Sequence, residues 1–222
     1  MDGENTAKMI LCNLIQEFTE LNGDRKLGDD ISVCGGIGYL HDIPVTVIAH
    51  NRGRTLAERI QCNFSMTTSI GFKKSERLCM QAEKFQRPII QIVDTVGAHI
   101  EDENNIGQHY FIASHIKNML ELNSPIGCII AGNALNTAAL AMSISDYCVL
   151  VHSGTLDYTT SSKFPNYRTN IDYLVSNEII DDTIILEDYA ELKDLLYVKI
   201  LKLRDLDIEL LKSKRYHKYR NL

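Results

Sequence analysis

The sequence predicts an α/β protein built on a mostly parallel sheet with helices on both faces. Three apolar runs of strand length, at 88–94, 125–132 and 147–151, alternate with segments of helical periodicity. Strands that are apolar throughout are typical of parallel sheets whose two faces are both buried. The second run repeats the strand-then-turn form of the first, which leaves few topologies other than right-handed crossovers.

The N-terminal part supplies further elements. Residues 5–21 carry apolar side chains at helical spacing, so we expect an N-terminal helix that extends to residue 21. Two short β-rich runs, 31–34 and 45–49, predict paired strands. A second helix is expected from Phe72 to Phe85, because Pro88 bounds its apolar pattern.

The C-terminal part closes the domain. We expect one helix from about Gly107 to Leu122 and a short one from Thr137 to Ser145. Residues 153–170 are polar and irregular, and residues 186–219 predict one or two closing helices. No low-complexity linker divides the chain, so residues 1–222 are expected to form a single domain.

Composition excludes several classes of protein. The formal net charge of −6 removes any general case for nucleic-acid binding. No apolar run approaches the ~20 residues that span a bilayer, and the N-terminus lacks the basic start of a signal peptide. The six cysteines are scattered, which favours buried thiols over disulfides or zinc ligands. We therefore expect a cytoplasmic protein without a metal centre that binds neither nucleic acid nor membrane.

Two loops follow the first two apolar strands, at 94–98 and 132–138. Ligands of open α/β sheets bind beyond the carboxyl ends of the strands. Each loop precedes a helix and can direct unpaired backbone N–H groups at an anion, such as the developing oxyanion of an acyl or ureido group. The alternative is that both are ordinary strand-to-helix turns, which occur in every α/β fold.

Positive charge is concentrated between Arg52 and Arg87. This stretch holds eight basic residues and three acidic ones. Such an excess on an acidic protein could attract an anionic ligand, for example a phosphorylated or carboxylated cofactor. A solvated helix face is the more common explanation. No G-x-S-x-G motif is present to support nucleophilic hydrolysis.

Short motifs along most of residues 16–219 match the motifs of one protein family and occur in the same order as in that family. The matching segments are Glu17–Arg25, Gly35–Ile37, Pro44–His50, Gly53–Arg54, Asn63–Met66, Gly71–Lys74, Gln81–Phe85, Asp94–Ala98, Gly107–Gln108 and Leu211–Tyr216. In this order the chain resembles the α subunit of acetyl-CoA carboxylase carboxyltransferase, a member of the crotonase-like superfamily.

The resemblance implies a crotonase-like fold of repeated β-β-α units with C-terminal helices. It implies a carboxyltransferase subunit of fatty acid biosynthesis that moves CO₂ from carboxybiotin to acetyl-CoA and so produces malonyl-CoA. A carboxyltransferase β subunit and a biotin carboxyl carrier protein would be its partners in a hetero-oligomer. No covalently bound cofactor is implied.

The resemblance also implies a set of site residues. The backbone N–H groups of Ala134 and Leu135, together with Gly97 and Ala98, take the catalytic positions of the oxyanion-type loops. The residues implied in binding carboxybiotin or acyl-CoA are Gly132, Asn133, Asn136, Thr137, Arg54, Lys73 and Lys74.

The chain departs from the family at the second loop. The family's G-E-G-G-S-G-G aligns with residues 132–138, where only Gly132 remains a glycine. A non-glycine residue forced to positive φ costs about 1–2 kcal/mol, and the side chain of Leu135 could fill the space that biotin needs. Val96 also replaces a proline. The region after Val151 is shortened to residues 154–168 and does not match the family.

These departures leave two hypotheses open. The chain is either an active carboxyltransferase subunit or a catalytically degenerate homologue that acts as a scaffold or as a regulatory or binding subunit. Loss of one oxyanion donor costs roughly 3–4 kcal/mol of transition-state stabilisation, so the state of the second loop decides between them. Whether the chain is an enzyme therefore stays open at this point.

Overall fold

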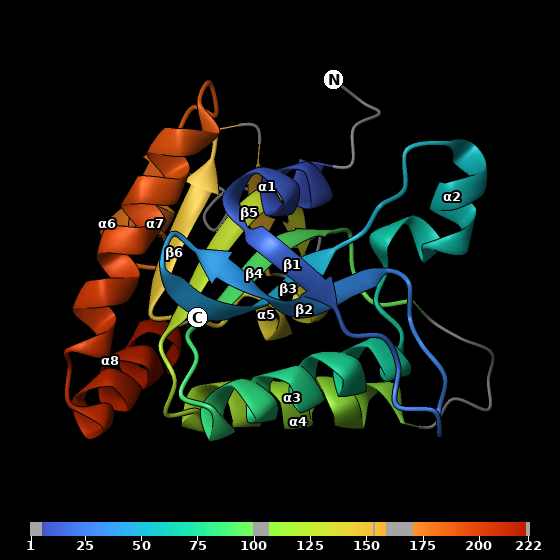
Figure 1. The fold of residues 1–222 in the computed structure, drawn as a ribbon, viewed down its shortest axis with the longest axis horizontal. Coiled ribbons are helices and arrows are strands. Elements are labelled where there is room, and N and C mark those ends of the chain that lie inside the picture. Colours follow the sequence, from blue (N-terminus) through green and yellow to red (C-terminus); the bar gives the residue numbers. More distant parts are fainter. Residues whose placement is uncertain (1–5, 100–106, 153, 159–170, 221–222) are drawn as a thin grey trace.

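The computed structural model describes residues 6–99, 107–152, 154–158 and 171–220. They form one sheet with helices on both faces (Figure 1). The sheet has eight strands in the order β1-β2-β3-β4-β5-β6-β8, with β7 paired to β5. The strands are β1 (Gln16–Glu20), β2 (Val33–Leu40), β3 (Ile43–His50), β4 (Ile89–Thr95), β5 (Ile126–Leu135), β6 (Tyr147–Val151), β7 (Thr155–Asp157) and β8 (Asp182–Ile184).

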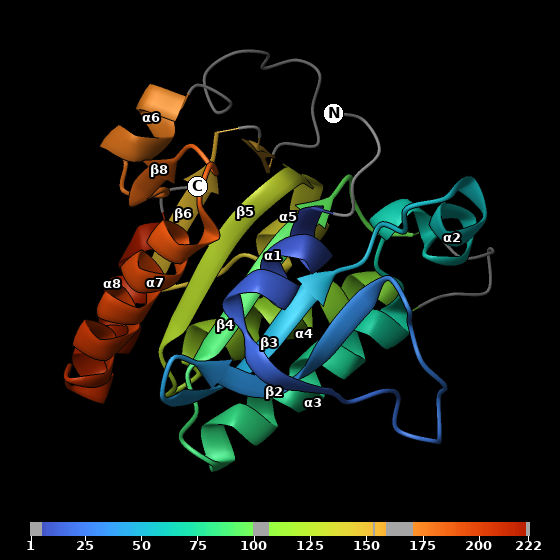
Figure 2. The same ribbon diagram turned by 45° about the horizontal axis from the view of Figure 1, so that its top comes forward.

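Helices cover both faces of this sheet. In the turned view, α3 and α4 lie beneath the strands, and α1 lies over the opposite face (Figure 2). The helices are α1 (Thr6–Leu14), α2 (Leu56–Gln61), α3 (Ser69–Lys84), α4 (Gln108–Glu121), α5 (Asn136–Ala141), α6 (Ile171–Ser176), α7 (Tyr189–Arg204) and α8 (Ile208–Arg220), with a short 3-10 helix, η1 (Asn63–Ser65).

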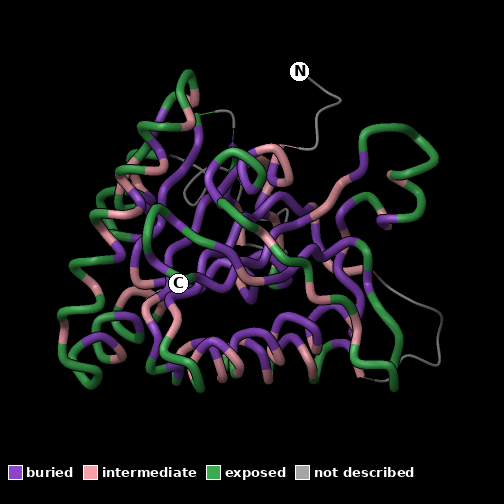
Figure 3. The backbone as a smooth tube through the Cα atoms, in the orientation of Figure 1, coloured by how far each residue is buried: buried purple, intermediate pink, exposed green. Residues whose placement is uncertain are grey.

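The predicted parallel sheet is confirmed. Strands β3 to β6 and β8 are parallel to one another, and β1 and β2 add antiparallel pairs at one edge. Ile89 and Val93 of β4 pack into the core that α3 and α4 share, whereas Ile90 and Ile92 pack into the core on the α1 and α7 side. Because both faces are buried, the strand is apolar at consecutive positions (Figure 3).

Most predicted elements lie where the periodicity placed them. The paired strands 31–34 and 45–49 are the β2–β3 hairpin. Helix α3 matches the expected 72–85, and α4 matches the expected 107–122. The third apolar run coincides with β6, and helices α7 and α8 occupy the expected closing region.

The expected helix over residues 5–21 is wrong beyond Leu14. Residues 16–20 form β1, which pairs antiparallel with β2 at the edge of the sheet. Glu17 has a φ of 50°, which a helix interior does not allow. A Cβ at Gly36 would lie 2.2 Å from the carbonyl oxygen of Thr19, so the glycines of β2 allow this close approach.

Smaller differences occur near the C-terminus. The helix expected over 137–145 is α5, which ends at Ala141. The region expected to be irregular contains β7, while residues 159–170 lie outside the described part. All six cysteines are free thiols; five are buried as predicted, and Cys12 is exposed.

One buried arginine fastens the C-terminal helix to the sheet. Arg215 of α8 is fully buried and forms a bidentate pair with Asp146, at 2.8 and 2.7 Å. Its other N–H groups donate to the carbonyl oxygens of Met119, Leu122 and Ser124 at the end of α4. All five donors of the guanidinium are used, which is the condition under which a buried charge is tolerated.

A helix needs about 20 consecutive apolar residues to cross a bilayer. Within these ranges, no helix combines the length and the apolar character needed to cross a membrane.

Acid should weaken the fold through His115, which α4 buries against Ser75 and Phe72. Burial lowers the pKa of His115 to about 4. At pH values between about 4 and its ordinary pKa of 6.5, this histidine is protonated in the unfolded chain and neutral in the folded one. This side chain therefore costs up to about 1.4 kcal/mol of stability for each pH unit lost.

The check is urea unfolding at pH 7, 6 and 5. We expect the free energy of unfolding of His115→Leu to fall less steeply with acid than that of the wild type. His109→Leu changes an exposed histidine of the same helix and should keep the wild-type slope. A wild-type slope in His115→Leu would contradict this account.

Candidate active site

The candidate site lies at the carboxyl ends of β4 and β5, where Asp94 is buried with 3% of its surface exposed. Its Oδ1 accepts a hydrogen bond from the backbone N–H of Asn133 at 3.1 Å. Arg52, which follows β3, places Nη1 3.5 Å from the same oxygen. A Cβ at Gly132 would lie 2.4 Å from that oxygen, so Gly132 lets the carboxylate reach β5. This contact explains why a glycine is required at position 132.

A second hydrogen bond joins the same two loops. The side-chain Nδ2 of Asn136 donates to the carbonyl oxygen of Val96 at 2.9 Å. Asn136 has a φ of 67°, where β5 ends and α5 begins. The amide of Gly97 donates to Oγ1 of Thr95 at 3.2 Å, so this predicted donor already has a partner within its own loop. The structure thus brings together the two loops that the sequence singled out.

A third segment, η1, supports this edge from the other side. The hydroxyl of Ser65 donates to the backbone carbonyl of Asp94, and the hydroxyl of Thr95 donates to the carbonyl of Ser65 at 2.6 Å. Asn63, Phe64 and Ser65 have φ values of 48°, 53° and 71°. The family motif that resembles this segment has glycine at the position of Ser65, which fits the left-handed backbone. Sequence reasoning did not assign these residues to the site.

His50 at the end of β3 is a further residue that the sequence did not indicate. It is buried, its Nδ1 accepts from the amide of Asp94 at 3.4 Å, and its Nε2 lies 3.2 Å from Oγ1 of Thr67. Burial lowers the pKa of His50 to about 4, so the ring is neutral at pH 7. Its role is to hold β3 beside β4.

Asp94 is therefore the charged group at the centre of the site. Burial raises the pKa of its carboxyl group, while the charge of Arg52 and the hydrogen bond from Asn133 act in the opposite direction. These two contacts favour the carboxylate form. The site combines a buried anion with two loops fixed at the ends of parallel strands.

The loop expected at 132–138 is a strand over its first half. Strand β5 continues to Leu135, and Ala134 pairs with Thr95 of β4 on one side and Leu156 of β7 on the other. The hydroxyl of Thr155 in β7 also donates to Oδ1 of Asn133 at 2.8 Å. This pairing with β7, which local sequence does not reveal, extends the ladder.

This extension places Ala134 and Leu135 in a strand and not in a loop. Ala134 and Leu135 pair with Leu156 and Asp157 of β7, so the ladder of the sheet continues through both residues. Leu135 is extended, with a φ of −115°, and Ala134 is fully buried. The expected positive-φ strain is absent at both residues, and it is Asn136 that adopts positive φ.

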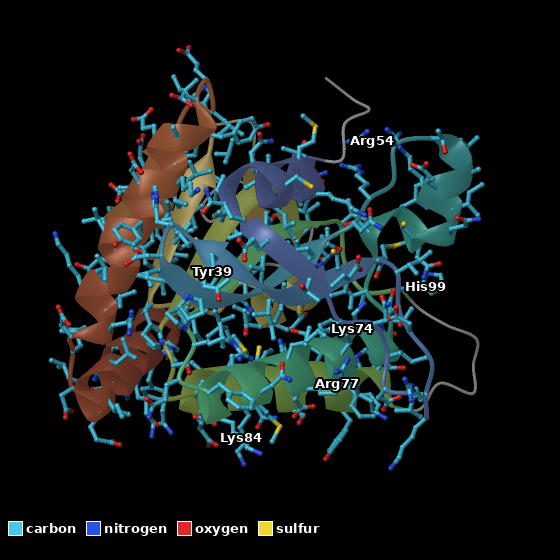
Figure 4. All side chains as sticks on the ribbon, viewed as in Figure 1. Tyr39, Arg54, Lys74, Arg77, Lys84 and His99 are labelled. Carbon is cyan, nitrogen blue, oxygen red and sulfur yellow. The ribbon has the colours of Figure 1, made fainter. Side chains whose placement is uncertain are left out.

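The predicted basic residues do not gather at this edge. The ammonium of Lys74 is buried, donating to the carbonyl of Val33 at 2.7 Å and pairing with Asp29 at 2.8 Å. Lys73 lies over the ring of Phe111, 4.0 Å from its centroid. Arg54 lies beside α2, apart from the basic residues of α3 (Figure 4). The charge of Lys74 is therefore compensated within the protein.

The contacts of Asp94 with Asn133 and of Asn136 with Val96 join the two loops, and we call these joined ends of β4 and β5 the clamped edge. The remaining predicted residues lie beside it. Ala98 forms a bridge with Thr67, and Thr137 is exposed in the first turn of α5. Among the described residues, no group of three or more histidine, cysteine or acidic side chains is arranged to hold a metal ion.

The parallel sheet, its antiparallel edge and the two loops at the strand ends define a crotonase-like α/β protein. Solved structures support this class at the level of the fold. A Pseudomonas malonate decarboxylase hetero-dimer matches with a TM-score of 0.74 and 15% identity, over 97% of this chain and 92% of that chain. Transcarboxylase 12S matches with a TM-score of 0.70 and 14% identity, over 91% of this chain and 41% of that chain.

Sequence comparison defines the family more closely. The model of the acetyl co-enzyme A carboxylase carboxyltransferase-like family matches residues 5–161, and the chain belongs to this family. The carboxyl transferase subunits beta/alpha of Clostridium tetani are 34% identical over 97% of the chain and 42% of the relative. The carboxyl transferase subunit alpha of Alkaliphilus oremlandii is 45% identical over 63% of the chain and 45% of the relative. The chain thus spans less than half the length of these relatives.

The contact between Gly132 and Asp94 can be measured by a double-mutant cycle. We expect Gly132→Ala to lower the free energy of unfolding by about 1–3 kcal/mol, because the new methyl group overlaps Oδ1 of Asp94. In an Asp94→Ala background the same change should cost less, since the overlapping atoms are gone. Urea unfolding of the four proteins gives the coupling. Equal costs in both backgrounds would show that the carboxylate does not impose the glycine.

Proposed function

We propose that this chain is the α-type carboxyltransferase subunit of an acetyl-CoA carboxylase. In this role it transfers CO₂ from carboxybiotin to acetyl-CoA, giving malonyl-CoA for fatty acid biosynthesis in the cytoplasm. The observation that carries the proposal is the family match over residues 5–161, which includes every segment of the clamped edge, from His50 to Asn136. Identity of 45% to a subunit named alpha supports the same assignment.

We infer the partners from the resemblance to the family and from the subunit names of the relatives. The Clostridium tetani relative carries both subunit names, and this chain matches 42% of its length. We infer that a separate β-type subunit supplies the acyl-CoA site and that a biotin carboxyl carrier protein delivers the carboxyl group. The working form would then be a hetero-oligomer.

Carboxybiotin, when bound, supplies the CO₂ unit. We propose that it binds beside Ala134 and Leu135, which lie at the end of β5 where that strand pairs with β7. What the chain's own residues do is hold the edge: Asp94 fixes the amide of Asn133, and Asn136 fixes the carbonyl of Val96. Leu135, the residue before α5, provides no side-chain cap to the first helical amides.

The scaffold alternative receives no support from the relatives. Those compared above are named as carboxyl transferase subunits. The alternative was motivated by positive-φ strain at non-glycine residues and by the side chain of Leu135 in the space of biotin. Ala134 and Leu135 do not adopt positive φ.

Reconstitution tests the proposed function. The chain, purified with a β-type carboxyltransferase subunit, is incubated with malonyl-CoA and biocytin, and loss of malonyl-CoA is followed. We expect turnover that requires both proteins, because each is proposed to hold one substrate. The β-type subunit alone serves as the control. Ala134→Gly combined with Leu135→Gly should give no gain, since both backbones are already extended. A stable complex without turnover would contradict the proposal.

A further inference from the structure

Arg52 occupies an unusual position between solvent and the buried Asp94. Its side chain is 35% exposed, whereas that of Asp94 is 4% exposed, and Nη1 lies 3.5 Å from Oδ1. Arg52 follows β3, so the pair connects the end of β3 to the end of β4. Arg52 belongs to the stretch of eight basic residues at 52–87, and its charge pairs with the end of β4.

The same oxygen of Asp94 also holds the end of β5. Oδ1 accepts the amide of Asn133 at 3.1 Å and packs against the backbone at Gly132. A carboxylate accepts such a bond more strongly than a protonated acid, which can carry its hydrogen on the very oxygen that must accept. The hold on β5 therefore depends on the ionisation of Asp94.

Contacts to Asp94 come from three segments of the described chain: β3 with the residues that follow it, β5, and η1. His50 ends β3 and is neutral because burial lowers its pKa to about 4, and Arg52 follows that strand. The contacts from β5 and η1 are the amide of Asn133 and the hydroxyl of Ser65, which do not titrate in the ordinary pH range. Burial raises the pKa of Asp94 and Arg52 opposes it, so Arg52 supplies the compensating charge.

We propose that Arg52 is a positioning residue: its guanidinium keeps Asp94 ionised, and the ionised carboxylate holds the end of β5 against the Asp94–Ala98 loop. Arg52 thus acts through Asp94. Its consequence for carboxyl transfer rests on the proposed function, whereas its effect on the position of β5 does not.

The direct test follows the backbone amide of Asn133 by ¹H–¹⁵N NMR as the pH is lowered. In the wild type we expect its resonance to titrate with Asp94, and Asp94→Asn should abolish that titration. Arg52→Gln should move the midpoint to higher pH, and Arg52→Lys should restore it towards the wild-type position. Lys84→Gln is the control: it removes a positive charge at the C-terminal end of α3 (Figure 4). This change should leave the midpoint of the titration unchanged.

A midpoint in Arg52→Gln equal to that of the wild type would overturn the proposal, as would an amide of Asn133 that does not titrate. The pH profile of kcat/KM in the reconstituted complex separates this inference from the proposed function. Its acid limb should move to higher pH in Arg52→Gln. If the wild-type complex has no turnover, the proposed function fails while the amide titration still decides the role of Arg52. An acid limb that stays in place in an active complex would count against positioning.

Discussion

The candidate site depends on the contacts that the carboxylate of Asp94 makes with Arg52 and with the amide of Asn133. A buried charge is tolerated only when it is paired and hydrogen-bonded. Here the partners come from two other strand ends, Arg52 after β3 and the amide of Asn133 in β5. Gly132 is required because any side chain would occupy the space of the carboxylate. One side chain at the end of β4 thus contacts groups at the ends of both neighbouring strands.

Much of the fold could be predicted from the sequence, because burial on both faces leaves consecutive apolar residues in the central strands. The prediction failed where a strand pairs with a segment that is distant in sequence. Residues 16–20 have an apolar spacing compatible with a helix, but the glycines of β2 allow them to add a strand at the edge. Residues 132–135 have the composition of a loop, but pairing with β7 extends β5 through them. Neither partner is visible in the local pattern.

The sequence predicts which loops form the candidate site, but it does not predict which side chains contact one another there. Strand ends locate the two loops, since ligands of such sheets bind there. Counting charges could not separate Lys74, which is buried against Asp29, from Arg52, which pairs with Asp94. His50 and Ser65 carry no motif that marks them as supports of Asp94, because their role depends on contacts between elements distant in sequence.

We propose that the biotin group of the substrate binds where β4 and β5 end. Backbone amide shifts measured by NMR during titration with biocytin test this claim directly. We expect changes concentrated at residues 96–98 and 136–137, the ends of the two loops. Changes confined to the cleft of about 570 Å³ that Asn177, Leu206 and Lys214 line between α6, α7 and α8 would contradict it.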